Sequence, residues 1–201
     1  MRCLMCGKEL GYGSLSDIIS GEDPLCMECR RKWQKRRISF CFEGIRLRSS
    51  YVYNEAFSKC LIQYKELADE ALKDVFLYED LRWFQRMYRE YQLVMMPSSL
   101  HKLQSRGFPH LRQMFECTGM EIIEPFVKTD EGDQKGKSKA MRHAIESGIV
   151  LRPDAQLHKK IVLCDDTITT GSTLKGALKA LAGMDLKIRI YTVSANYRWL
   201  K

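Results

Sequence analysis

Residues 158–178, HKKIVLCDDTITTGSTLKGAL, constrain the fold more than any other part of this sequence. The apolar run 161–164 is typical of a strand that is buried on both faces of a sheet. Two aspartates and a loop rich in threonine follow it, and residues 171–182 then have the pattern of a helix. A strand, a loop and a helix in this order predict one βα unit of a parallel sheet.

The loop of this unit carries the residue types of a phosphate-binding site. Ligands of open parallel sheets bind at the carboxyl ends of the strands, which is where this loop lies. Hydroxyl groups and the N–H groups of a helix N-terminus can hold phosphate oxygens, and a glycine lets the backbone approach them closely. Adjacent carboxylates can accept hydrogen bonds from the hydroxyls of a ribose. The prediction is a ribose 5-phosphate site made of Asp165, Asp166, Thr169, Thr170, Gly171, Ser172 and Thr173. The alternative is an acidic turn that only caps the helix.

Strand and helix patterns alternate along the rest of the chain, which indicates an α/β fold with a parallel sheet covered by helices on both faces. The expected strands are residues 49–53, 93–96, 122–126, 161–164 and 188–193. The expected helices are residues 54–65, 66–90, 109–117, 138–147 and 171–182. Asn54 caps the first of them, and the second breaks near residues 78–80. The polar residues 128–139 predict a loop.

Four clustered cysteines define a separate N-terminal module. Cys3, Cys6, Cys26 and Cys29 form two CxxC pairs, which can supply four thiolates to one Zn²⁺ ion in a closed tetrahedral site. Gly7 suits the tight turn after the first pair. The alternative is a redox CxxC motif, which needs only one pair beside a βαβ unit. The other cysteines, Cys41, Cys60, Cys117 and Cys164, lack ligand spacing and are expected to be small buried side chains.

A basic run follows the second pair, in a chain with 33 Lys and Arg against 25 Asp and Glu, a formal charge of +8. Such an excess suits an anionic partner. The run suggests contacts of single-stranded nucleic acid with phosphate-binding cations and a stacking tryptophan. Its candidate residues are Arg30, Arg31, Lys32, Trp33, Lys35, Arg36 and Arg37. The alternative is a solvated helical face with Trp33 packed on the cysteine module.

The length and hydropathy of the chain limit its domain organisation and its location. The 201 residues, 45% of them hydrophobic, suit one domain and a small module, expected at residues 49–201 and 1–40. No apolar run approaches the ~20 residues that a membrane span needs, and the first residues do not have the pattern of a signal peptide. We therefore expect a cytosolic protein without membrane insertion.

Together these motifs resemble a known family. The strand, the aspartate pair and TTGST are similar to the loop that binds phosphoribosyl pyrophosphate (PRPP) in type I phosphoribosyltransferases. Joined to a four-cysteine module, residues 3–195 resemble the late-competence ComF family of bacterial natural transformation. The residues that agree further are Gln63, Tyr64, Lys65, Pro97, Arg106, Gly107 and Phe108.

The resemblance implies a type I phosphoribosyltransferase fold and a competence factor that binds PRPP with Mg²⁺ and handles imported single-stranded DNA. It also implies a place near the membrane-bound uptake machinery, with a competence helicase and other DNA-processing proteins as partners. The chain departs from the family pattern at Pro109 and His110, where Asn-Gln is usual, at residues 95–98, and at Ile145, where Asn is usual. His101 and His110 carry no partner motif, and lone histidines are more often structural than catalytic.

The second hypothesis is an active phosphoribosyltransferase that moves the phosphoribosyl group from PRPP to an amine or base. Negative charge then develops on the leaving pyrophosphate, and cations stabilise it. The candidate cations are Lys65, Lys102, Arg106, Lys137 and Arg142. The alternative for Lys65, Arg106 and Arg142 is an ordinary surface cation. The sequence identifies no site for an acceptor.

Overall fold

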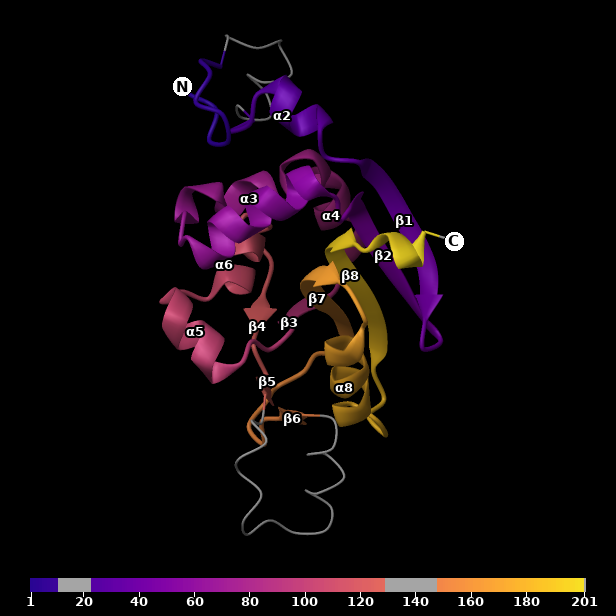
Figure 1. Cartoon of the computed structure of the whole chain (residues 1–201). Helices are drawn as coiled ribbons and strands as arrows, with labels where there is room; N and C mark the ends of the chain where they lie inside the picture. Colours follow the sequence, from indigo (N-terminus) through magenta and orange to yellow (C-terminus); the bar gives the residue numbers. More distant parts are fainter. Residues whose placement is uncertain (11–22, 129–147, 201) are drawn as a thin grey trace.

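The computed structural model describes residues 1–10, 23–128 and 148–200. Its central feature is a six-stranded sheet with the order β1-β2-β8-β7-β3-β4 (Figure 1). The strands are β1 (Lys35–Phe42), β2 (Ile45–Val52), β3 (Gln92–Met95), β4 (Ile122–Ile123), β7 (Lys160–Ile168) and β8 (Lys187–Ala195). Every neighbouring pair is parallel except β1 with β2, which form an antiparallel hairpin at one edge. Two short strands, β5 (Phe126–Lys128) and β6 (Ile149–Leu151), pair separately.

The described helices lie mostly between the parallel strands, except that α2 precedes β1 and η3 follows β8. They are α2 (Met27–Arg31), α3 (Glu55–Glu66), α4 (Leu81–Tyr88), α5 (Leu100–Arg106), α6 (His110–Glu116) and α8 (Ser172–Ala180), with 3₁₀ turns η1 (Glu70–Val75), η2 (Tyr78–Asp80) and η3 (Tyr197–Trp199). Asn54 caps α3 as predicted, since its side chain accepts a 2.9 Å hydrogen bond from the N–H of Phe57. The helix expected at 66–90 is instead η1, η2 and α4, and the helix expected at 138–147 lies outside the described residues. In the ranges that the structure describes, no helix combines the length and the apolar character needed to cross a membrane.

Burial of the central strands explains the apolar runs in the sequence. All residues of β3 and the segment 161–164 of β7 are buried, as expected for parallel strands covered on both faces. Phe84 and Tyr88 of α4 pack their rings on Tyr191 of β8, with centroids 4.8 and 6.2 Å apart. The predicted α/β class with a mostly parallel sheet flanked by helices is therefore confirmed.

The order of the strands creates a switch point between β3 and β7. The chain continues from β3 to β4 on one side, whereas it continues from β7 through α8 to β8 on the other. Crevices at such points, outside the carboxyl ends of the strands, are where α/β sheets bind ligands. Residues 96–99 and the TTGST loop therefore meet at the edge of the sheet where a ligand is expected.

The N-terminal segment packs on the sheet domain and shares its core. Cys3, Leu25 and Trp33 belong to the same cluster of buried side chains as the strands, and Figure 1 shows α2 next to α3. The expected boundary at residue 40 falls inside β1, which starts at Lys35 and is hydrogen-bonded to β2. The sheet thus begins within the segment that the sequence pattern had assigned to the cysteine module.

The four cysteines outside the cluster are only partly as expected. Cys60 and Cys164 are buried and Cys117 is half-buried, but Cys41 is exposed. Cys41 is exposed because it lies on β1, an edge strand whose side chains are mostly exposed.

Candidate functional site

A polar pocket of about 330 Å³ lies at the switch point. Seven predicted residues line it, namely Lys65, Lys102, Arg106, Asp165, Asp166, Thr169 and Thr173. They come from α3, α5, β7, the loop before α8 and the first turn of α8, segments up to 108 positions apart, which the fold brings together. The volume lies within the usual range of small-molecule sites. Lys137 and Arg142 lie outside the described residues.

The loop before α8 presents an open helix N-terminus. Gly171 is the N-cap residue and offers no side-chain cap; the N–H of Ser172 donates a long 3.4 Å bond to Oγ1 of Thr170. The hydroxyls of Thr170 and Ser172 lie 3.1 Å apart beside it. Free N–H groups and hydroxyls in this arrangement suit an anion such as a phosphate.

Gly171 has a structural reason besides the expected approach to a ligand. Its φ is +80°, and a Cβ atom at this position would lie 2.6 Å from the ring of Phe42. A side chain here would therefore require Phe42 to move. The positive φ adds strain for any L-residue.

Asp166 is the centre of a buried ion cluster. Its Oδ2 atom lies 2.7 Å from Nζ of Lys65 and 3.1 Å from Nε2 of His110, and the residue is only 7% exposed. Burial alone would raise the pKa of Asp166, but the Lys65 charge and the bond to His110 outweigh it and hold the pKa below its usual range. Asp166 is therefore ionised at neutral pH.

His110 is a site residue that the sequence analysis missed. Burial lowers the pKa of His110 against the opposing effect of Asp166, so the ring is neutral at neutral pH and donates from Nε2 to Asp166. Its Nδ1 faces Nη1 of Arg106 at 3.4 Å, and Nη2 of Arg106 pairs with Glu66 at 2.7 Å. No local signal could reveal this role, because Asp166 is 56 positions away.

Arg106 keeps one unpaired donor. Its Nε atom is buried and has no hydrogen-bond partner among the described residues. A buried unpaired donor is costly, and Arg106 lines the pocket. A ligand oxygen would satisfy it.

Asp165 differs from its neighbour. Burial and the charge of Asp166 raise the pKa of Asp165 to about 8, and its Oδ1 accepts a 2.9 Å bond from the N–H of Asp166. Two adjacent aspartates thus have opposite protonation preferences. Both line the pocket where the ribose hydroxyls were expected, together with Lys128 of β5, which the sequence analysis had assigned to a loop.

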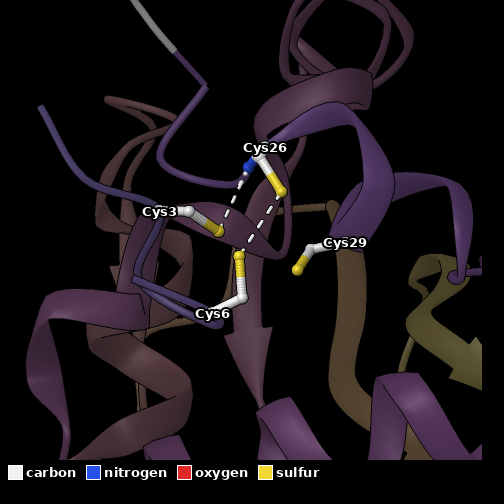
Figure 2. Close-up of side chains that lie close together, drawn as sticks. All are labelled: Cys3, Cys6, Cys26 and Cys29. Atoms are coloured by element: carbon white, nitrogen blue, oxygen red, sulfur yellow. Dashed lines mark hydrogen bonds between the residues drawn. The ribbon is translucent and has the colours of Figure 1, made fainter. Parts of the chain in front are cut away.

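The four clustered cysteines form a second site (Figure 2). Their side chains point toward one another, and all four sulfur atoms lie within 4.8 Å of one another. The Sγ atoms of Cys6 and Cys26 are 3.6 Å apart, close to the ~3.8 Å that tetrahedral Zn–S bonds of ~2.3 Å require. The donor set and spacing therefore fit a tetrahedral metal ion.

Local structure holds these sulfurs in place. The N–H of Gly7, with φ +73°, bonds to the carbonyl of Cys3 at 2.9 Å and closes the first CxxC turn. The second pair begins α2 with Cys26 as N-cap, and the N–H of Cys26 donates to Sγ of Cys3 at 3.2 Å. Despite partial burial, backbone N–H bonds lower the pKa of Cys3 to about 6, whereas burial raises the pKa of Cys29. A cation among the sulfurs would let all four ionise.

Much of the basic run 30–37 is not available to a ligand. Arg30 is 8% exposed, and it pairs with Asp23 at 2.6 Å and donates to the carbonyl of Val75 at 2.9 Å. Trp33 is 4% exposed and packs on Phe57 with ring centroids 4.8 Å apart. The expectation that Trp33 stacks on a base is therefore wrong, because its ring lies in the core.

The rest of the run divides into paired and unpaired cations. Lys35 and Arg37 bind the buried carboxylate of Asp80 at 3.2 and 2.9 Å. Arg31, Lys32 and Arg36 are exposed and form no ion pair with any carboxylate of the described residues. The run is also not one helical face, since it spans the end of α2 and the start of β1.

The fold and the two sites define a class of protein. It is an α/β protein with a mostly parallel sheet, a polar pocket at the switch point and a four-cysteine cluster that could hold a metal ion. Sequence comparison adds particular relatives. The chain is 28% identical to competence protein ComFC of Streptococcus pneumoniae over 209 residues, which cover 90% of this chain and 93% of that protein. It is 27% identical to competence protein ComFC of Bacillus subtilis over 136 residues, which cover 67% of this chain and 57% of that protein.

The chain thus has ComFC homologues in two bacteria, and the resemblance inferred from the motifs is confirmed. No protein-family model matches the sequence. Among solved structures, adenine phosphoribosyltransferase from Saccharomyces cerevisiae is similar with a TM-score of 0.41 and 12% identity, covering 86% of this chain and 88% of that chain.

Proposed function

We propose that this chain is a competence protein that binds PRPP with Mg²⁺ in the switch-point pocket. One observation carries the proposal: carboxylates, loop hydroxyls and cations from distant segments line one pocket beside an open helix N-terminus. The 5-phosphate would bind at the TTGST loop and the ribose hydroxyls at Asp165 and Asp166. Lys102 and Arg106 would face the pyrophosphate, whose oxygen would satisfy the unpaired Nε of Arg106. Bound Mg²⁺ would neutralise part of the charge on the pyrophosphate.

The proposal includes a structural zinc ion in the four-cysteine cluster and a role with imported single-stranded DNA in the cytoplasm. Support for zinc comes from the four thiols and their spacing, which suit a closed tetrahedral site. Support for the DNA role comes from the ComFC homologues and the excess positive charge. Docking on a competence helicase or on the membrane uptake machinery belongs to the same proposal.

Mg²⁺ with PRPP is expected to raise the melting temperature by roughly 5–10 °C, since a ligand at ~100 times its dissociation constant adds ~2.7 kcal/mol of stability. Thr169→Asp should abolish the shift, because Thr169 is exposed and lines the pocket, and a carboxylate there repels phosphate. Ala182→Asp, which adds the same charge at an exposed position beyond the other end of α8, should keep the shift. Differential scanning fluorimetry measures the melting temperature of the unsubstituted protein and of both variants, with and without PRPP. Absence of a shift in the unsubstituted protein at millimolar PRPP contradicts the proposal.

A second candidate function is transfer of the phosphoribosyl group. It is favoured by the cations Lys102, Arg106 and Lys128, which share the pocket with the aspartates. In this reaction the bond from the sugar C1 to pyrophosphate breaks, a bond to an acceptor nitrogen forms, and that nitrogen loses a proton. Release of pyrophosphate that depends on an added amine or base would establish it, whereas binding without release would leave PRPP as a ligand.

A further inference from the structure

A second pocket of about 310 Å³ has a different chemistry from the switch-point pocket. It is lined by Arg46 and Arg48 of β2, Arg189 of β8, and Met87, Tyr88 and Tyr91 in and just after α4. It shares no lining residue with the switch-point pocket, and its described lining contains no carboxylate. Its charge is therefore wholly positive.

The three arginines share one face of the sheet. β2 and β8 are parallel, with Leu47 opposite Ile190 and Arg48 opposite Tyr191. Because side chains alternate along strands, Arg46, Arg48 and Arg189 lie on the same side. Within the described ranges none of them forms an ion pair with a carboxylate, although Arg48 and Arg189 are half-buried. Like charges on neighbouring strands repel one another, so a bound anion would stabilise this arrangement.

The cations of the pocket alternate with aromatic rings. The guanidinium carbon of Arg48 lies 5.7 Å from the centroid of Trp83. Arg37 lies 5.8 Å from the same ring, but its charge is already compensated by Asp80. Tyr91, which is half-buried, borders the pocket on α4's C-terminal side. Cations interleaved with aromatic side chains are typical of surfaces that follow a single-stranded nucleic acid, whereas a free phosphate would occupy only the pocket.

We propose that Arg46, Arg48 and Arg189, which we term the arginine face, bind the phosphate backbone of single-stranded DNA, with one phosphate in the pocket between them. The choice of DNA rests on the proposed function, but the surface lies outside the run 30–37. The ligand is a phosphodiester chain that runs along β2 and past α4.

The test compares two double variants that remove the same charge. Anisotropy of a fluorescent oligothymidylate of ~20 nucleotides is measured between ~50 and ~200 mM salt. Arg46→Gln with Arg189→Gln should reduce the slope of log affinity against log salt by about 0.7, the value for the one phosphate contact that is lost, and weaken binding ~10-fold at the lower salt. Arg31→Gln with Arg36→Gln, both exposed and unpaired, should leave slope and affinity unchanged. Arg46→Lys with Arg189→Lys keeps the charges and should keep the slope.

Any of the following results would overturn the proposal. Equal weakening in both Gln pairs would mean that net charge alone governs binding, and an unchanged Arg46→Gln, Arg189→Gln variant would place the DNA elsewhere. If the Arg46→Gln, Arg189→Gln variant unfolds, the folded Arg46→Lys, Arg189→Lys variant is tested instead. Loss of its salt dependence of binding would then overturn the proposal. Inorganic phosphate at millimolar concentration should not displace the oligonucleotide; full displacement would indicate a free-phosphate site. The PRPP-induced melting shift is a separate readout, so its loss or retention reports on the switch-point pocket alone.

Discussion

Cys26→Ser is expected to reduce bound zinc from one ion per chain to near zero and to destabilise the protein by about 3 kcal/mol or more, because structural zinc contributes directly to folding energy. Cys26 supplies one sulfur and also donates its N–H to Cys3, which belongs to the common core. Loss of the ion should therefore weaken the whole fold rather than only the first residues. Metal analysis and urea unfolding measure the two effects.

Cys41→Ser is the matched control. Cys41 is exposed on β1, outside the cluster, so this variant should keep full zinc and change the free energy of unfolding by less than ~0.5 kcal/mol. Equal zinc loss in both variants, or full zinc in Cys26→Ser, would show that the four clustered cysteines are not the ligands.

Asp166→Asn and Asp165→Asn are expected to have opposite effects, although the two residues are adjacent. Asp166→Asn keeps the shape but leaves the poorly exposed Lys65 charge without its partner, which should cost ~3 kcal/mol. Asp165→Asn removes a carboxyl group whose pKa is raised to about 8 by burial and by Asp166. It can still accept the bond from the N–H of Asp166, and it should not destabilise the protein.

The pH dependence follows from the signs of these shifts. The folded pKa of Asp166 is lowered, so its stabilising effect is present above the unfolded value of ~3.9 and is lost as the pH falls below it. The folded pKa of Asp165 is raised, so stability is lost as the pH rises from ~4 toward 8. Asp165→Asn should therefore match the unsubstituted protein near pH 4 and exceed it by up to ~5 kcal/mol at pH 8.

Urea unfolding of both variants at several pH values measures these differences. Equal destabilisation by the two substitutions at pH 8 would contradict the distinct roles assigned to Asp165 and Asp166. An Asp166→Asn variant as stable as the unsubstituted protein would show that the contacts to Lys65 and His110 contribute little.

Features that depend on local sequence could be predicted. The βα unit around β7 and α8, the Asn54 cap of α3 and the two CxxC turns each depend on residues close together in the chain. α5 had such a signal as well, since Ser99 caps its start and Gly107 ends it with φ +77°. That signal was not used in the sequence analysis.

Most features that depend on contacts between distant residues could not be predicted from the sequence. β1 is different, because Ile38, Phe40 and Phe42 alternate with exposed residues at the spacing of a half-buried strand, and this local signal was missed. Trp33 looked like part of a charged run, but its place is decided by Tyr51, Phe57 and Phe76. His110 belongs to the site only because the fold places it against Asp166 of β7, which is 56 positions away.

Hydrogen exchange measured by mass spectrometry can test the claim that PRPP binds in the switch-point pocket. Saturating PRPP with Mg²⁺ should slow amide exchange in peptides that contain residues 165–175, because the open N–H groups at the start of α8 would bind the phosphate. Exchange in residues 35–48 should not change. Unchanged exchange in residues 165–175 at saturation, or protection only elsewhere, would contradict the claim.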